Sequence, residues 1–299
     1  MAESAPPTPA LPPAGPAWAG SLMGTSIASS LSFLHGLVGP GLVLLAVATG
    51  LLLTFTVGWL QHRDPSFSQP FMGPWGMVAM GLMSLGGAWT AATGHLGTQL
   101  VAWLVGMPLA VVVCLWQLRR FNGAPTFLWG LAVVSPMVAA TSGGQLASAL
   151  PDPWAQWVRA VALGCFLLSL LTGVPLFARV YAARPRIPAP FAGTTWIPLG
   201  IVGQSTAAAH VLLDAPVAHT YGLVMFSLGV PLIVVAARRF WGGAVRRWAA
   251  YTPAWWGSTF PAGTLSLGAA YLGWPALSAG FLGLLLVHWV VCVARFATR

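Results

Sequence analysis

The distribution of arginine is the feature that most constrains the fold of this chain. All thirteen basic residues are arginines, and twelve of them fall in five patches that each follow two long apolar stretches. The patches are Arg63; Arg119 and Arg120; Arg179, Arg184 and Arg186; Arg238, Arg239, Arg246 and Arg247; and Arg295 and Arg299. Cytoplasmic loops of membrane proteins concentrate Lys and Arg, whereas translocated loops avoid them. The pattern therefore predicts a multi-pass membrane protein with both termini in the cytoplasm.

The overall composition predicts the same class. The chain is 57% hydrophobic and 6% charged, whereas soluble domains carry about a quarter charged residues. The apolar runs last about twenty residues, which suits helices crossing a core of about 30 Å rather than the shorter strands of a barrel. The formal net charge of +9 lies at the ends of these runs. It indicates topology and contact with an anionic lipid bilayer, not binding of nucleic acid.

Ten apolar spans follow a tail rich in Pro and Ala. Residues 1–17 are predicted to be a disordered tail, and residues 18–299 a single transmembrane domain. The spans run near 18–35, 40–61, 71–92, 96–118, 127–148, 155–180, 190–211, 217–239, 253–271 and 275–296. The connections opposite the arginine patches are short and contain Asp152 and Asp214. Arg159 is the exception on that side, where it either snorkels to the interface or serves an external vestibule.

The even-numbered spans carry a second repeat. Gly106-Met107-Pro108-Leu109 resembles the segments that begin at Gly173 and Gly229, and weaker echoes begin at Gly50 and Gly283. Because these segments keep step with the arginine patches, they indicate five copies of one helical hairpin. Repeats of one period commonly arrange themselves around an axis. The fold prediction is therefore all-α, with ten transmembrane helices forming five hairpins in a quasi-fivefold arrangement.

The odd-numbered and even-numbered spans differ in composition. Odd spans are rich in Gly, Ser and Thr, whereas even spans are dominated by Leu and Val. Small and hydroxyl residues suit close helix packing or a water-filled path, and bulky aliphatic residues suit lipid. We therefore expect five inner helices, formed by the odd spans, surrounded by five outer helices.

The candidate pore-lining and kink residues all lie in the odd spans. They are Thr25, Ser26, Ser29, Gly81, Ser84, Pro136, Thr141, Pro198, Gln204, Ser205, Thr259, Pro261 and Thr264. The three prolines are expected to kink their helices, because proline removes a backbone donor. A hydroxyl within a helix often bonds back to its own helix instead, so the prediction rests on the group rather than on any single residue.

The inner spans contain no Asp, Glu or Lys. Such residues usually mark cation sites and proton relays in membranes, so their absence argues against a cation channel. No catalytic constellation is found, and Cys114, Cys165 and Cys292 lack metal or disulfide spacing. We therefore expect no enzyme activity, no metal and no cofactor. Hydroxyl donors and exposed amides in an uncharged path favour anions, and His210 is the candidate pH sensor.

The segment Pro253-Ala254-Trp255-Trp256-Gly257-Ser258-Thr259-Phe260-Pro261-Ala262-Gly263 resembles the penultimate helix of a known family. This is the tellurite-resistance/dicarboxylate transporter family, which includes bacterial TehA-like proteins, plant slow-type anion channels and the yeast malate permease. Met23-Gly24-Thr25, the segment from Pro70-Phe71 to Met80, and the helix with Pro136 extend the resemblance over most of the chain.

The resemblance implies a homotrimer in which each protomer has a central pore of five kinked helices. It also implies that Phe260 closes the pore, although on the residues alone this side chain would be interpreted as packing. The expected function is an anion channel or transporter in a bacterial inner membrane, passing chloride, nitrate or a small organic anion. The alternative is a proton-coupled exporter of a C4-dicarboxylate, sulfite or tellurite.

Overall fold

The computed structural model describes residues 11–67 and 71–299, and within these residues every regular element is a helix. The α-helices are α1 (Ala19–Leu34), α2 (Val38–His62), α3 (Gly73–Thr93), α4 (Leu96–Leu118), α5 (Gly130–Ala147), α6 (Trp154–Ala183), α7 (Ile197–Leu212), α8 (Ala215–Arg239), α9 (Thr259–Tyr271) and α10 (Pro275–Ala297). The predicted all-α fold is confirmed. Each predicted apolar span coincides with one of these helices, together with any short helix that precedes it.

Five short helices complete the elements of the described residues. Four are 3₁₀-helices, η1 (Pro16–Trp18), η2 (Phe127–Trp129), η3 (Ala189–Trp196) and η5 (Pro253–Ser258), and η4 (Phe240–Val245) is a π-helix. Two of the 3₁₀-helices explain a difference from the predicted kinks. Pro198 and Pro261 lie in the first turn of α7 and α9, just after η3 and η5. They begin an α-helix there, because the first turn needs no backbone donor at that position.

Six helical segments are long and apolar enough to cross a membrane by length and composition. They are Val38–His62, Leu96–Leu118, Phe127–Ala147, Trp154–Ala183, Ala215–Val245 and Pro275–Ala297. Five of these contain the even-numbered helices, and the sixth contains α5. The remaining odd-numbered helices are shorter or richer in small polar residues, which lowers their hydropathy.

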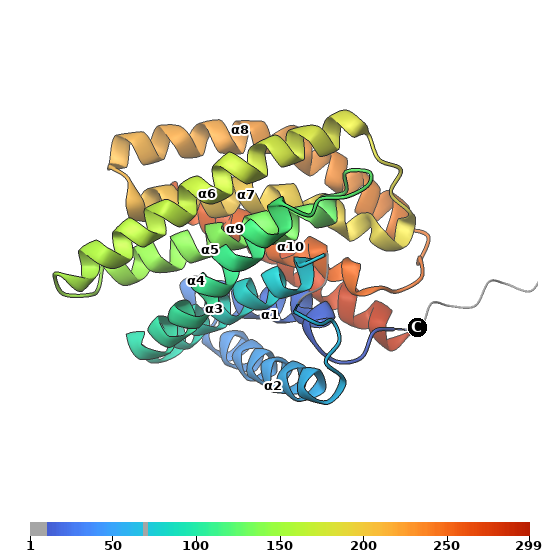
Figure 1. Ribbon diagram of the computed structural model, residues 1–299, viewed down its shortest axis with the longest axis horizontal. Helices are drawn as coiled ribbons and strands as arrows, with labels where there is room; N and C mark the ends of the chain where they lie inside the picture. The colour runs from blue at the N-terminus through green and yellow to red at the C-terminus, as the bar shows by residue number, and fades with distance from the viewer. Residues whose placement is uncertain (1–10, 68–70) are drawn as a thin grey trace, which may run out of the picture.

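The odd-numbered helices form a closed ring. Contacts join α1 to α3, α3 to α5, α5 to α7, α7 to α9, and α9 back to α1. Each even-numbered helix packs outside this ring against the odd-numbered helix that precedes it, as α2 does on α1 and α10 on α9. Figure 1 shows the resulting bundle, with α2 and α8 on opposite flanks. The links after α6 and α8 lie at the same end as the C terminus (Figure 1), and this end, which carries the arginine patches, is called the arginine-rich end.

Close backbone contact holds α9 in the ring. A Cβ atom on Gly203 of α7 would collide with the backbone of Thr264, and one on Gly24 of α1 would collide with the Thr259 side chain. A Cβ atom on Gly268 of α9 would in turn lie 2.8 Å from the backbone carbonyl oxygen of Gly203. Small residues at these crossings permit the short distance between helix axes that van der Waals packing in lipid requires.

The repeated glycines of the outer helices face inward in three of the five copies. A Cβ atom on Gly106 would lie 2.6 Å from the Met83 side chain of α3, and one on Gly229 would lie 2.9 Å from Val202 of α7. Gly173 faces Ile201 of α7 in the same way, whereas the echoes at Gly50 and Gly283 meet open space. The strong copies of the repeat therefore mark where an outer helix approaches the ring.

The N-terminal segment contacts the arginine-rich end. The Trp18 indole N–H donates to the Pro12 carbonyl over 3.0 Å, and its ring stacks on Tyr251 with 6.1 Å between centroids. Residues 11–17, assigned to the tail on composition, therefore have defined contacts. The reason is that Trp18 and Gly58 supply surfaces against which they pack. The first ten residues of the predicted tail lie outside the described residues.

Candidate functional site

Three cavities lie along the inside of the ring. The largest has a volume of about 670 Å³ and is lined chiefly by the C-terminal halves of α1, α3, α5 and α9, at the end away from the arginine patches. A second cavity of about 290 Å³ opens among η5, η3 and the N-terminal segment. A third of about 20 Å³ lies between the first two; it shares Phe260 with the largest cavity, and Met77, Leu131, Ile197 and Gly257 with the second. The described residues that line the three cavities include no Asp, Glu, Lys or Arg.

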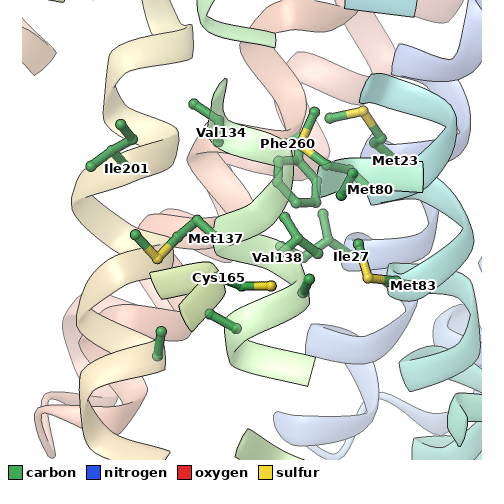
Figure 2. Packing of buried hydrophobic residues seen from close by; sticks show 14 of the residues in the cluster. Met23, Ile27, Met80, Met83, Val134, Met137, Val138, Cys165, Ile201 and Phe260 are labelled. Carbon is green, nitrogen blue, oxygen red and sulfur yellow. The ribbon is translucent and has the colours of Figure 1, made fainter. Parts of the chain in front are cut away.

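Phe260 separates the largest cavity from the smallest. Its side chain lines both and is 3% exposed. Figure 2 shows its ring among apolar side chains of α1, α3 and α5, including Ile27, Met80, Val134 and Val138. The path between the cavities is therefore closed by Phe260 and the apolar side chains packed around it.

The turn that carries Phe260 is built from hydroxyl side chains and proline. Ser258 and Thr259 each donate to the carbonyl three residues earlier, at Trp255 and Trp256, over 2.9 and 2.8 Å. These bonds satisfy carbonyls in the tight turns of η5, and Pro261 then begins the α-helical geometry of α9. The sequence Ser-Thr-Phe-Pro thus sets Phe260 at the point where η5 changes into α9.

His288 of α10 supports this turn from outside the ring. Its Nδ1 atom lies 2.9 Å from the Ser258 carbonyl, to which it donates, and the residue is fully buried. Aromatic rings surround the imidazole, with centroids at 4.7 Å for Trp196, 4.9 Å for Phe240 and 5.3 Å for Trp241. The π-helical turn η4 contributes two of these rings, because its extra residue per turn changes which side chains face inward.

The wall of the largest cavity carries a chain of amide and hydroxyl groups. The Gln99 amide nitrogen lies 3.0 Å from the Gln145 amide oxygen and 3.3 Å from the Ser142 hydroxyl. The Gln145 amide nitrogen then lies 3.2 Å from the Tyr271 hydroxyl. Gln99 comes from α4, Gln145 from α5 and Tyr271 from the end of α9. All four side chains line this cavity.

Few of the residues predicted to line a pore reach these cavities. Ser84, Thr141, Gln204 and Phe260 line the largest cavity, and Pro261 lines the smallest together with Phe260. Thr141 donates to the Gln204 backbone carbonyl over 3.2 Å. The Gln204 amide oxygen is buried without a hydrogen-bond partner. The structure thus brings together predicted residues from α3, α5, α7 and α9.

The other predicted residues lie at contacts between helices rather than along the three cavities. Thr25 accepts a hydrogen bond from Trp289 of α10 over 2.9 Å, and Ser29 donates to the Gly41 carbonyl of α2 over 2.8 Å. Their polar groups face outer helices because each inner helix presents small polar residues on several sides. The remaining predicted residues line none of the three cavities, and they are Ser26, Gly81, Pro136, Pro198, Ser205, Thr259 and Thr264.

His210 lies beside the largest cavity without lining it. Its Nδ1 atom is 3.1 Å from the Thr206 carbonyl, and its ring lies 5.9 Å from that of Tyr271. Arg159 donates to the Leu212 carbonyl over 2.6 Å, so it caps the C-terminal end of α7. Among the described residues, no group of three or more His, Cys, Asp or Glu side chains could hold a metal ion.

The polar wall of the largest cavity was not predicted from the sequence. Gln99 and Gln145 could have indicated this wall, because an amide side chain within an apolar span needs a hydrogen-bond partner and seldom faces lipid. Tyr271 falls at the end of a predicted span, where a polar residue is common. The apolar residues around Phe260 offered no signal, since Met and Ile occur throughout the spans.

These features define a class of protein, a multi-pass helical membrane protein with uncharged cavities inside a ring of helices. A family model described as voltage-dependent anion channel (SLAC1) matches residues 14–297, and the chain belongs to this family. This match confirms the resemblance stated from the sequence. Because the members of the family are channels or transporters, the function at this level is anion channel or transporter. No curated protein and no solved structure matched the chain.

Proposed function

We propose that the chain is an anion channel whose pore runs inside the ring of odd-numbered helices and is closed by Phe260. One observation carries the proposal, namely that Phe260 lines the cavities on both of its sides and is surrounded by apolar side chains. A constriction lined by hydrocarbon excludes water and therefore blocks a hydrated ion. The five hairpins then form ten membrane crossings in a quasi-fivefold arrangement.

Opening requires the Phe260 ring to leave the path. The helix itself is poorly placed to move, because α9 touches α1 and α7 through glycines that leave no free space. Rotation of one side chain costs far less than separating packed backbones. The Phe260 side chain is therefore the moving part in this proposal, and α9 is its fixed support.

The uncharged lining favours small monovalent anions such as chloride and nitrate. Hydroxyl and amide donors of the largest cavity can replace part of a hydration shell. A dianion loses far more solvation in a medium of low dielectric constant, since the Born energy rises with the square of the charge. The described cavities offer no Arg or Lys to offset that loss.

The proposed setting is a bacterial inner membrane, with the arginine-rich end in the cytoplasm. The outer helices expose Leu and Val to lipid, including Leu171 and Val230. A homotrimer with one pore in each protomer is the proposed assembly. It rests on the resemblance to the family alone.

The decisive experiment compares anion flux through liposomes that contain wild-type protein or Phe260→Ala. We expect the variant to raise chloride and nitrate flux by about tenfold or more, which needs removal of only about 1.4 kcal/mol of barrier. Phe226→Ala is the matched control, because Phe226 is a buried phenylalanine of α8 that lines none of the three cavities. Equal flux for wild type and Phe260→Ala would reject the gate.

A coupled carrier is the second candidate. The observation in its favour is the position of His210, a titratable side chain next to Tyr271 in the cavity wall. A proton-coupled exporter of a C4-dicarboxylate, sulfite or tellurite would show saturable flux that follows the pH gradient. In that case His210→Ala would abolish the pH dependence, whereas a channel would retain its conductance.

A further inference from the structure

The hydrogen bonds in the wall of the largest cavity have a fixed direction. The Gln99 amide nitrogen lies 3.4 Å from the Ser142 backbone carbonyl, which can only accept. This contact identifies the Gln99 group as the NH₂ end of the amide. The same nitrogen lies 3.0 Å from Gln145, so the Gln145 atom facing it must be the carbonyl oxygen.

The next hydrogen bond links Gln145 to Tyr271 at the end of α9. With its oxygen turned toward Gln99, Gln145 presents its NH₂ group to the Tyr271 hydroxyl 3.2 Å away. The Tyr271 oxygen accepts this bond, so its own proton remains available for another acceptor. No hydrogen bond donated by Tyr271 is found within the described part of the chain, and the side chain lines the cavity. The chain of donors therefore ends in a hydroxyl proton that faces open space.

We propose that the Tyr271 hydroxyl is an anion-binding site in the largest cavity, with a monovalent inorganic anion such as chloride, bromide or nitrate as its ligand. Each amide in this series of hydrogen bonds polarises the next group, which strengthens the Tyr271 hydroxyl as the final donor. The inference deepens the proposed function, since it places an anion on one side of Phe260 before passage. Tyr271 follows Phe260 by eleven residues along α9, which corresponds to about 16 Å of helix.

The chemistry of the site suits a transient ligand. Its donors are neutral, and the lining described above contains no basic side chain. An anion is therefore held by oriented dipoles alone, and such a site binds weakly enough to release its ion. At this position the hydroxyl proton of Tyr271 favours an anion over a cation.

Anomalous diffraction from crystals soaked in bromide tests the site in the closed protein. The wild type is expected to show a bromide peak within hydrogen-bonding distance of the Tyr271 oxygen. The Tyr271→Phe variant should lose the peak, whereas Tyr221→Phe should keep it, because Tyr221 of α8 does not line this cavity. Absence of a peak in the wild type, or an equal peak in Tyr271→Phe, would overturn the assignment.

A flux measurement tests the same donor in an open pore. In a Phe260→Ala background, Tyr271→Phe should raise the half-saturating chloride concentration by about tenfold, the range expected for a hydrogen bond to a charged group. Gln145→Met leaves the Tyr271 hydroxyl in place and removes only its polarisation, so it should raise this concentration less than Tyr271→Phe does. Adding Gln145→Met to Tyr271→Phe should change little further, since the donor is already absent. An unchanged half-saturating concentration would reject the site. A Phe260→Ala protein without flux would reject the gate instead, and the bromide result would stand separately.

Discussion

Helices α5 and α10 have similar lengths, yet the protein buries them to very different degrees. In the segment Phe127–Ala147, which contains α5, 94% of the most apolar stretch of 18 residues is buried, compared with 28% for the corresponding stretch of α10. The mean hydropathy of the same two stretches has the opposite order, at 1.4 for α5 and 2.2 for α10. The more apolar helix is therefore the more exposed one, which is the reverse of the order in a soluble protein.

The difference follows from the solvent. Lipid tails are as apolar as leucine, so an outer helix gains little by hiding leucine from them. Inner helices instead gain from close van der Waals contact and from hydrogen bonds between helices, and both favour Gly, Ser and Thr. Burial in this fold is thus a consequence of small size and shape rather than of hydrophobicity.

The largest expected effect comes from filling a close contact in the ring. Gly203→Leu should destabilise the protein by more than about 3 kcal/mol, the upper part of the range for overpacking, because its side chain would meet the Thr264 backbone. Gly164→Leu is the matched control on the outer face of α6, where a Cβ atom meets nothing within 4 Å. Thermal unfolding in detergent measures both. Equal losses would contradict the distinction between inner and outer helices.

An intermediate effect is expected where an outer helix supports the turn that carries Phe260. His288→Leu should cost about 1–2 kcal/mol, since it removes the donor to the Ser258 carbonyl. His288→Asn should recover part of this loss, because its amide can donate from a similar position. His219→Leu, at an exposed position on α8, should change the unfolding temperature little. A His288→Leu protein as stable as wild type would show that the bond contributes nothing.

The smallest effect compares two serines of outer helices. Ser169 of α6 donates to the Val133 carbonyl of α5 over 2.7 Å, whereas Ser227 of α8 donates to Leu223 of its own helix over 2.8 Å. Ser169→Ala should cost about 0.6 kcal/mol, the average for hydrogen bonds between membrane helices. Ser227→Ala should be neutral in the same denaturation assay. A larger loss of stability for Ser227→Ala than for Ser169→Ala would show that hydrogen bonds between helices stabilise this protein no more than bonds within one helix.

The helices themselves were predictable in detail. The span predicted near residues 96–118 coincides with α4, and the other boundaries differ by a few residues. Composition was sufficient because long apolar runs, short polar links and arginine patches are each local in sequence. The 3₁₀ geometry of the residues that precede Pro198 and Pro261 was not predicted, since proline can either kink a helix or begin one.

The lining of the cavities was much less predictable. Thr25 and Ser84 are both hydroxyl residues of odd-numbered spans, yet Thr25 contacts α10 and Ser84 lines the largest cavity. Inner helices carry small polar residues on several faces, so composition does not reveal which face points inward. Tyr271 and Gln145 likewise come together only because the ends of α5 and α9 meet.

The sequence by itself determined that this chain is a helical membrane protein, where its helices begin and end, and which five helices are rich in small residues. These properties depend on the transfer of whole segments from water to lipid, and each segment carries that information alone. The tertiary structure decided how the ring closes, which side chains meet around Phe260, and that a chain of donors ends at Tyr271. Those properties depend on the rotation of each helix about its axis, which is set by contacts between residues distant in the chain.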